Sequence, residues 1–223
     1  MQDHLFGSLA KPFNLKATIS MMTGKTFAKL PITFVGIALL PGCAFVDQKI
    51  DLPYNKPSVS FSATRKPILV ARPDDGSLSR KGTSFVILGK VKNGYGMTTA
   101  DVVSENSVAD WVAGALKAEL DASGFDATLV DRLPAKVERG LEIYIDDVSV
   151  ETDIGFFTVG DLSHVKLLVR VWKGSHKIKE FRVQSYGNPR HFASGWASNK
   201  ARSLETALKE CVKKIVTEVT SLN

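Results

Sequence analysis

The octapeptide Val165–Trp172, with the sequence VKLLVRVW, alternates with a period of two. One set of alternate positions is wholly apolar and consists of Val165, Leu167, Val169 and Val171. The other set holds Lys166, Leu168, Arg170 and Trp172. Because successive side chains of a β-strand point to opposite faces of a sheet, this segment is predicted to be a strand with one buried face.

Two further segments continue the same alternation. Upstream, Leu141, Ile143 and Ile145 alternate with Glu142, Tyr144 and Asp146; downstream, Phe181 and Val183 continue the pattern on a third strand. Lys173-Gly174-Ser175 is a short hairpin loop between the second and third strands. The three segments predict an antiparallel meander that buries one face.

The rest of the chain adds strands and two helices around this meander. Strands are predicted over 67–71, 84–91 and 125–130, with turns over 73–76 and 92–96. Apolar residues recur at helical spacing over 108–122 and about 199–220, with Ser107 and Ser198 as N-caps. This order predicts an α+β fold, an antiparallel (mixed) sheet with two helices packed on one face.

Both helices place one distinctive residue on the apolar stripe. Trp111 shares its stripe with Val108 and Val112, and Cys211 shares its own with Leu208 and Ile215. Both are therefore expected to be core residues, with Cys211 an unreactive thiol.

The strand positions that point away from the helices form a candidate partner-binding face. It consists of Tyr144, Leu168, Arg170, Trp172 and Tyr186. Aromatic residues mixed with arginine are typical of binding hot spots. The alternative is that the segment before residue 67, or the loop after Val130, folds over these side chains and makes a second small core.

The N-terminal part has the order of an export signal. Lys25 and Lys29 precede an apolar run over 30–40, which ends at Gly42 and Cys43. The run is too short for a bilayer span of about 20 residues. Residues 1–20 fit poorly before such a signal, so translation is expected to begin at Met21 or Met22; the alternative is an extended basic region.

Leu40-Pro41-Gly42-Cys43 resembles the lipobox of bacterial lipoproteins, although Pro41 departs from its usual small residue. The resemblance implies that Cys43 is acylated and becomes the first residue of the mature protein. We thus expect a leader and lipoprotein signal peptide over 1–42, a lipidated N-terminus and flexible tether over 43–66, and a single α+β periplasmic domain over 67–223. Pro53 and Pro57 favour the tether.

The charge of the expected mature chain is nearly balanced. The whole sequence has 29 basic and 23 acidic residues, for a net charge of +6. The leader holds four of the basic residues and one of the acidic ones, which leaves 25 and 22. This balance does not favour nucleic acid as a partner.

The chain from about Cys43 to Val219 resembles the YajG-like uncharacterised bacterial lipoproteins. The resemblance rests on Ala197-Ser198-Asn199-Lys200 leading into the last helix, on Lys90-Val91, on the helix closing at Gly124-Phe125, and on the long meander behind a lipobox. It implies an outer-membrane lipoprotein of a Gram-negative bacterium, facing the periplasm. Ala44 after the cysteine, in place of Asp, implies sorting to the outer membrane. The family has no established activity, so it implies no catalytic residues.

The residues offer little chemistry of their own. Ser163 and Lys166 match a Ser-x-x-Lys spacing, but positions three apart on a strand point to opposite faces. Asp146, Asp147, Glu151 and Asp153 are the one acidic concentration, and a solvated strand edge is the interpretation favoured over acid–base catalysis or cation binding. No metal site and no cofactor are expected.

Three classes of function remain open. The first is a non-catalytic envelope lipoprotein that supports an assembly and has an envelope protein partner. The second is a periplasmic lipid- or glycan-binding accessory protein with a groove between sheet and helices. The third, least favoured, is a hydrolase. The chain is therefore expected not to be an enzyme.

Overall fold

The computed structural model describes residues 46–57, 65–93, 95–154, 159–187, 190–191 and 197–222. All of them belong to one unit, which spans residues 40–223. The expected lipid-attachment residue Cys43 and the sorting residue Ala44 lie outside the described residues.

The meander predicted from the period-two segments is confirmed. Strand β7 (Val137–Ile154) pairs antiparallel with β8 (Val159–Gly174), which pairs antiparallel with β9 (His176–Gly187). All three strands are longer than the alternating segments that predict them. A register shift between Ile145 and Asp147 places Asp146 and Asp147 in succession on the less buried side, which interrupts the alternation within β7.

Strand β7 lies inside the sheet and is paired with different strands at its two ends. Its first half pairs parallel with β2 (Lys66–Ala71), which pairs parallel with β6 (Phe125–Val130). Its second half pairs parallel with β4 (Phe85–Lys92) at Gly89 and Lys90. A Cβ on Gly89 would lie 1.9 Å from the Val150 carbonyl oxygen, so this pairing requires glycine.

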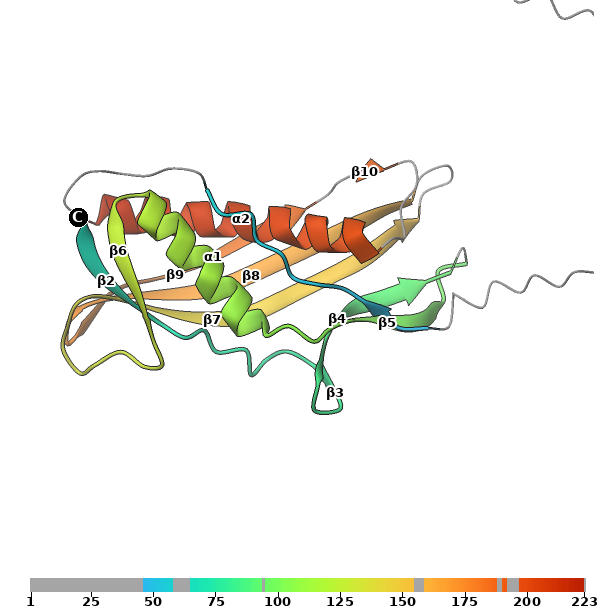
Figure 1. Ribbon diagram of the computed structural model, residues 1–223, viewed down its shortest axis with the longest axis horizontal. Coiled ribbons are helices and arrows are strands. Elements are labelled where there is room, and N and C mark those ends of the chain that lie inside the picture. Colours follow the sequence, from blue (N-terminus) through green and yellow to red (C-terminus); the bar gives the residue numbers. More distant parts are fainter. Residues whose placement is uncertain are drawn as a thin grey trace, which may run out of the picture. The chain divides into compact units, whose positions relative to one another are not determined.

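The sheet contains four strands that the pattern does not predict. Strand β5 (Thr98–Ser104) pairs antiparallel with β4, and β1 (Gln48–Lys49) pairs parallel with β5. The short strands β3 (Arg80–Lys81) and β10 (Arg190–His191) pair with β4 and β8. In the described residues, the resulting ten-stranded mixed sheet and two helices confirm the α+β fold class (Figure 1).

The first helix, α1 (Val108–Ala122), has the predicted bounds, and the Ser107 hydroxyl caps it by accepting from the Asp110 amide at 3.1 Å. Gly124 follows it with a φ of 90°, a conformation that favours glycine. The second helix, α2 (Ala197–Ser221), begins before Ser198, so Ser198 lies in its first turn and not at its N-cap.

One core joins the helices to the sheet. Helix α2 packs against β7, β8 and β9, and α1 packs against β6 and α2. The predicted inward residues of the meander are all buried: Leu141, Ile143, Ile145, Val165, Leu167, Val169 and Val171. Trp111 is 7% exposed and Cys211 is fully buried, as predicted.

The prediction of a flexible tether over 43–66 is wrong for residues 46–57, which pack on the domain. Ile50 and Leu52 are buried in the core. The indole Nε1 of Trp111 donates to the Pro53 carbonyl at 2.8 Å, and the Tyr54 hydroxyl donates to Glu119 Oε1 at 2.7 Å. The two prolines break regular structure, but the apolar residues around them still bury their side chains.

Candidate partner-binding face

The outer face of β7, β8 and β9 is the side that the helices leave uncovered. The five predicted face residues, Tyr144, Leu168, Arg170, Trp172 and Tyr186, all lie in outward positions of these strands. Leu168 is directly opposite both Tyr144 on β7 and Arg182 on β9. Tyr186 is 55% exposed, and the other four are half-buried.

Arg170 organises the middle of this face. Its Nη1 donates to the Tyr144 hydroxyl at 2.9 Å, and its guanidinium carbon lies 4.6 Å from the centre of the Tyr144 ring. Its Nε donates to Glu180 Oε2 at 2.6 Å, which raises the pKa of Arg170. Lys177 also donates to Glu180, and the two cations lower the pKa of that carboxyl to about 2.

One end of the face is flanked by the loop after β6. The indole Nε1 of Trp172 donates to Glu142 Oε2 at 2.9 Å. Beside this pair is a cavity of about 190 Å³, which is also lined by Leu133, Pro134 and Ala135 of the loop. The loop over 131–136 therefore flanks Trp172, as the alternative interpretation of the face expects, while Tyr186 at the other end stays exposed.

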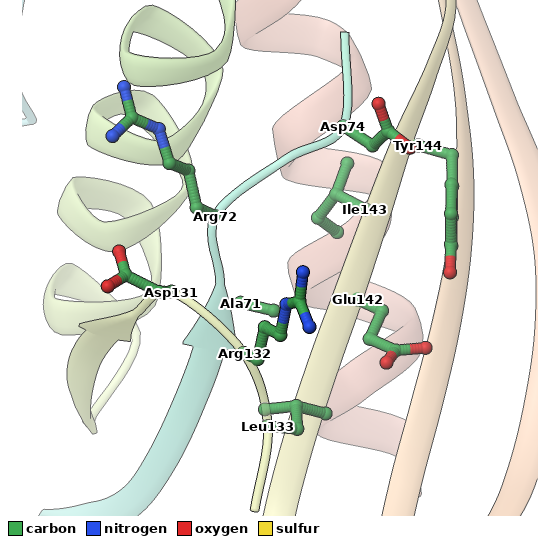
Figure 2. Close-up of a pocket in the computed structure, with 9 residues that line it drawn as sticks. All are labelled: Ala71, Arg72, Asp74, Asp131, Arg132, Leu133, Glu142, Ile143 and Tyr144. Carbon is green, nitrogen blue, oxygen red and sulfur yellow. The ribbon is translucent and has the colours of Figure 1, made fainter. Parts of the chain in front are cut away.

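The loop is held there by a close contact with β7. A Cβ on Gly140 would lie 2.7 Å from Leu133 Cδ1, so the leucine side chain packs directly on the glycine and would have to shift if a larger residue replaced it. A larger pocket of about 430 Å³ lies on the other side of the loop and is lined by Ala71, Arg72, Asp74, Asp131, Arg132, Leu133, Glu142, Ile143 and Tyr144. Figure 2 shows Arg132 between the segment after Ala71 and strand β7, with Glu142 and Tyr144 on the strand beside it.

The other end of the face contains a histidine that the sequence analysis does not assign to it. The rings of His164 and Tyr186 stack with centroids 4.6 Å apart and 15° between their planes. His164 Nδ1 lies 2.8 Å from Asp147 Oδ2, which also accepts from the Ser149 hydroxyl. The alternation of β8 places His164 in phase with Lys166 and Leu168, and this phase is the signal that could have found it.

The acidic concentration is paired with basic groups and lies on an interior strand. Arg182 Nε donates to Asp146 at 3.2 Å, His164 contacts Asp147, and Lys92 lies 3.6 Å from Glu151. The side chain of Asp153 is outside the described part of the chain. Because Glu151 also lies opposite Lys90 of β4, the interpretation of the acidic residues as a strand edge is wrong for Glu151.

The remaining sequence candidates do not converge on a reactive centre. Ser163 is buried on the helix side of β8 and Lys166 lies on the outer side, so they are separated as predicted. The described side chains form no group of three or more His, Cys, Asp or Glu suited to a metal ion. Among the described residues, no helix combines the length and apolar character needed to cross a bilayer.

The expected ligand groove between sheet and helices is open at the β9 edge, where a groove lies beside α2, but the interior behind it is filled in the described part of the fold. Leu141 and Val169 of the sheet and Leu204, Leu208 and Ile215 of α2 are all completely buried there. The two cavities above lie instead beside the outer side of β7, around the loop that follows β6.

No family model and no curated protein matches the chain. Solved structures of similar fold include a Xanthomonas campestris protein of family DUF330, with a TM-score of 0.47 and 12% identity, over 79% of this chain and 96% of that one. A Helicobacter pylori protein described as a neuraminyllactose-binding hemagglutinin homolog gives a TM-score of 0.45 and 13% identity, over 76% and 93%.

A minor lipoprotein from Acinetobacter baumannii gives a TM-score of 0.39 and 9% identity, over 70% of this chain and 91% of that one. The structural neighbours thus include a bacterial protein described as a lipoprotein and one of family DUF330. At these identities and TM-scores, the likeness carries no argument about function.

Proposed function

We propose that this chain is a YajG-like lipoprotein, anchored in the outer membrane through Cys43, whose periplasmic domain is non-catalytic and docks an envelope protein. The docking surface is the outer face of β7–β9. The observation that carries the proposal is the placement of Tyr144, Leu168, Arg170 and Tyr186 on one uncovered side of the sheet. Aromatic groups next to arginine bury much area with a fixed geometry on binding.

The rigidity of this face supports a binding role. Tyr144 and Glu180 hold the Arg170 guanidinium, and His164 holds the Tyr186 ring. Side chains already fixed by such contacts lose less conformational entropy when a partner covers them. The face is thus preorganised, and Asp146 and Glu180 on it are held in ion pairs with Arg182 and Arg170.

Site-specific photo-crosslinking in intact cells tests the docking role. A photoreactive amino acid at Tyr186 is expected to give a discrete protein adduct. The same probe at Tyr95 is a matched control, since that tyrosine is 90% exposed on the turn between β4 and β5 and belongs to none of the strands that form the face. Equal adducts at Tyr186 and Tyr95, or no adduct at Tyr186, would remove the support for this face.

The anchor is tested separately. Cys43→Ser is expected to abolish metabolic palmitate label and to release the protein from membranes, because a thioether-linked lipid needs the cysteine sulfur. On density separation of envelopes, the unaltered protein should sediment with porins, and Ala44→Asp should move it to the inner membrane. Persistent label in Cys43→Ser would refute lipidation at this residue.

A further inference from the structure

Strand β9 is an edge strand of the described sheet. It pairs with β8 along its length and with no other described strand. An edge strand presents unpaired backbone groups, which can hydrogen-bond a further strand. The edge is twelve residues long, more than enough for an extended segment to pair along it.

A groove runs between this edge and helix α2. It has a volume of about 410 Å³ and is lined by Lys179, Phe181, Arg182, Val183, Gln184, Lys214 and Glu218. The Lys214 ammonium donates to the Gln184 carbonyl at 2.8 Å. Because Lys214 belongs to α2 and not to the sheet, the bond shows that this carbonyl is accessible from outside the β8–β9 ladder.

The charged side chains of the groove determine which kind of extended peptide segment it can bind. Its lining has three cations, Lys179, Arg182 and Lys214, against the single carboxylate of Glu218. Lys179 pairs with Glu218 at 2.5 Å and Arg182 pairs with Asp146 at 3.2 Å, whereas Lys214 donates to the neutral Gln184 carbonyl. Lys214 is therefore the cation of the lining that an added carboxylate can neutralise. A segment with carboxylates at alternate positions would complement this edge, whereas a lysine-rich one would be repelled.

A second copy of the chain fits this edge less well. Strand β9 itself has Lys177, Lys179 and Arg182 against one acidic residue, Glu180. Two such strands side by side would bring like charges together, which destabilises cross-strand pairing.

We propose that the β9 edge binds an acidic, extended segment of a partner protein by strand addition. The backbone of the segment pairs with β9 and takes the Gln184 carbonyl from Lys214, while its carboxylates, on the side that faces α2, contact Lys214. This inference concerns the edge and goes beyond the proposed docking by the outer face, since neither surface requires the other.

The test uses the full chain in detergent and two synthetic ten-residue peptides. One alternates glutamate with valine, and the other alternates lysine with valine. The acidic peptide is expected to bind and to slow backbone hydrogen exchange over 180–186, and the basic peptide is expected not to bind. Lys214→Glu should weaken the acidic peptide about tenfold or more, since it places a like charge at the contact.

Lys213→Glu is the matched control. It makes the same charge change one residue away on α2, where Lys213 pairs with Glu210 outside the groove, and should change the affinity less than twofold. Equal binding of both peptides, unchanged exchange in β9, or equal effects of the two variants would overturn the proposal. Disulfide-linked dimers of Gln184→Cys that form without peptide would assign the edge to a second copy and also overturn it.

The outcome is separable from that of the proposed function. The peptide test measures binding and hydrogen exchange at β9 in the purified protein, whereas the crosslinking test measures protein adducts at Tyr186 in cells. A failed peptide test with adducts at Tyr186 would leave face docking standing, and the reverse result would leave only the edge.

Discussion

Lys200 Nζ on α2 lies 2.8 Å from Asp161 Oδ1 on β8, and each side chain is only 1% exposed. Ser203 lies about one turn further along α2. Its hydroxyl is within hydrogen-bond distance of the carbonyls of Asp161 and Gly187, and these contacts join the helix to β8 and β9. This arrangement explains the lysine of Ala197-Ser198-Asn199-Lys200 as a structural residue. It holds the first turn of α2 on the sheet.

Removal of one member of this ion pair should destabilise the fold strongly. Lys200→Ala leaves Asp161 buried without its ammonium partner, which costs about 3–5 kcal/mol. The double variant Lys200→Met with Asp161→Leu should recover most of this loss, because it removes both buried charges. Urea denaturation followed by circular dichroism measures both. A double variant as unstable as Lys200→Ala would show that the pair is not the reason for the loss.

Trp111→Ala should both weaken the core and release the segment 46–57. Truncation of a buried tryptophan costs about 3–5 kcal/mol. The same change removes the indole bond to the Pro53 carbonyl. Limited proteolysis should therefore cut near Pro53 sooner in this variant. Asn55→Ala, which keeps the indole bond, is the control; equal cleavage of the two variants would contradict a specific role for the indole.

The stability of the domain should fall above pH 9 because of two groups, the buried Cys211 thiol of α2 and the half-buried Tyr54 hydroxyl beside α1. Burial raises the pKa of the Cys211 thiol to about 12, and burial together with Glu119 raises the pKa of the Tyr54 hydroxyl. The unfolded state binds fewer protons once pH exceeds the unfolded cysteine pKa of about 8.5. Stability from Cys211 is therefore complete below that value and is lost as pH rises toward 12.

The variants Cys211→Ala and Tyr54→Phe should each lose less stability than the unaltered protein as pH rises. Urea titrations between pH 8 and 10.5 measure the free energy of unfolding. In the Cys43→Ser background, native Cys211 should also resist a thiol reagent at pH 8, because only the thiolate reacts. Rapid labelling of the folded protein, or an unchanged slope in both variants, would contradict the burial argument.

Substitution of Tyr186 should affect partner binding with little effect on stability, whereas substitution of Trp172 should affect both. Tyr186 is 55% exposed, so Tyr186→Ala should change the free energy of unfolding by about 0.5 kcal/mol or less. Trp172 is half-buried, bonds Glu142 and is flanked by the loop after β6, so Trp172→Ala should lower the melting temperature as well. Differential scanning fluorimetry measures both; equal shifts would mean that Tyr186 is also part of the packed structure.

The sequence by itself determined the local elements of this protein. The period-two alternation located the buried and outer faces of the meander, and helical spacing gave the bounds of α1 and the burial of Trp111 and Cys211. These signals depend on residues two to four apart, whose side-chain directions follow from the backbone geometry alone. At the register shift after Ile145 that geometry changes and the alternation ends. The alternation therefore does not predict the second half of β7.

Only the tertiary structure decided which strands meet. The pairing of β7 with β2 and β4, the strand β5, and the packing of residues 46–57 depend on contacts between distant segments. Lys200 and Asp161 are 39 residues apart, and a lysine near a helix start has the same local pattern whether exposed or buried. The edge groove of β9 likewise exists only because α2 returns over the sheet, so the folded chain, not its local periodicity, creates it.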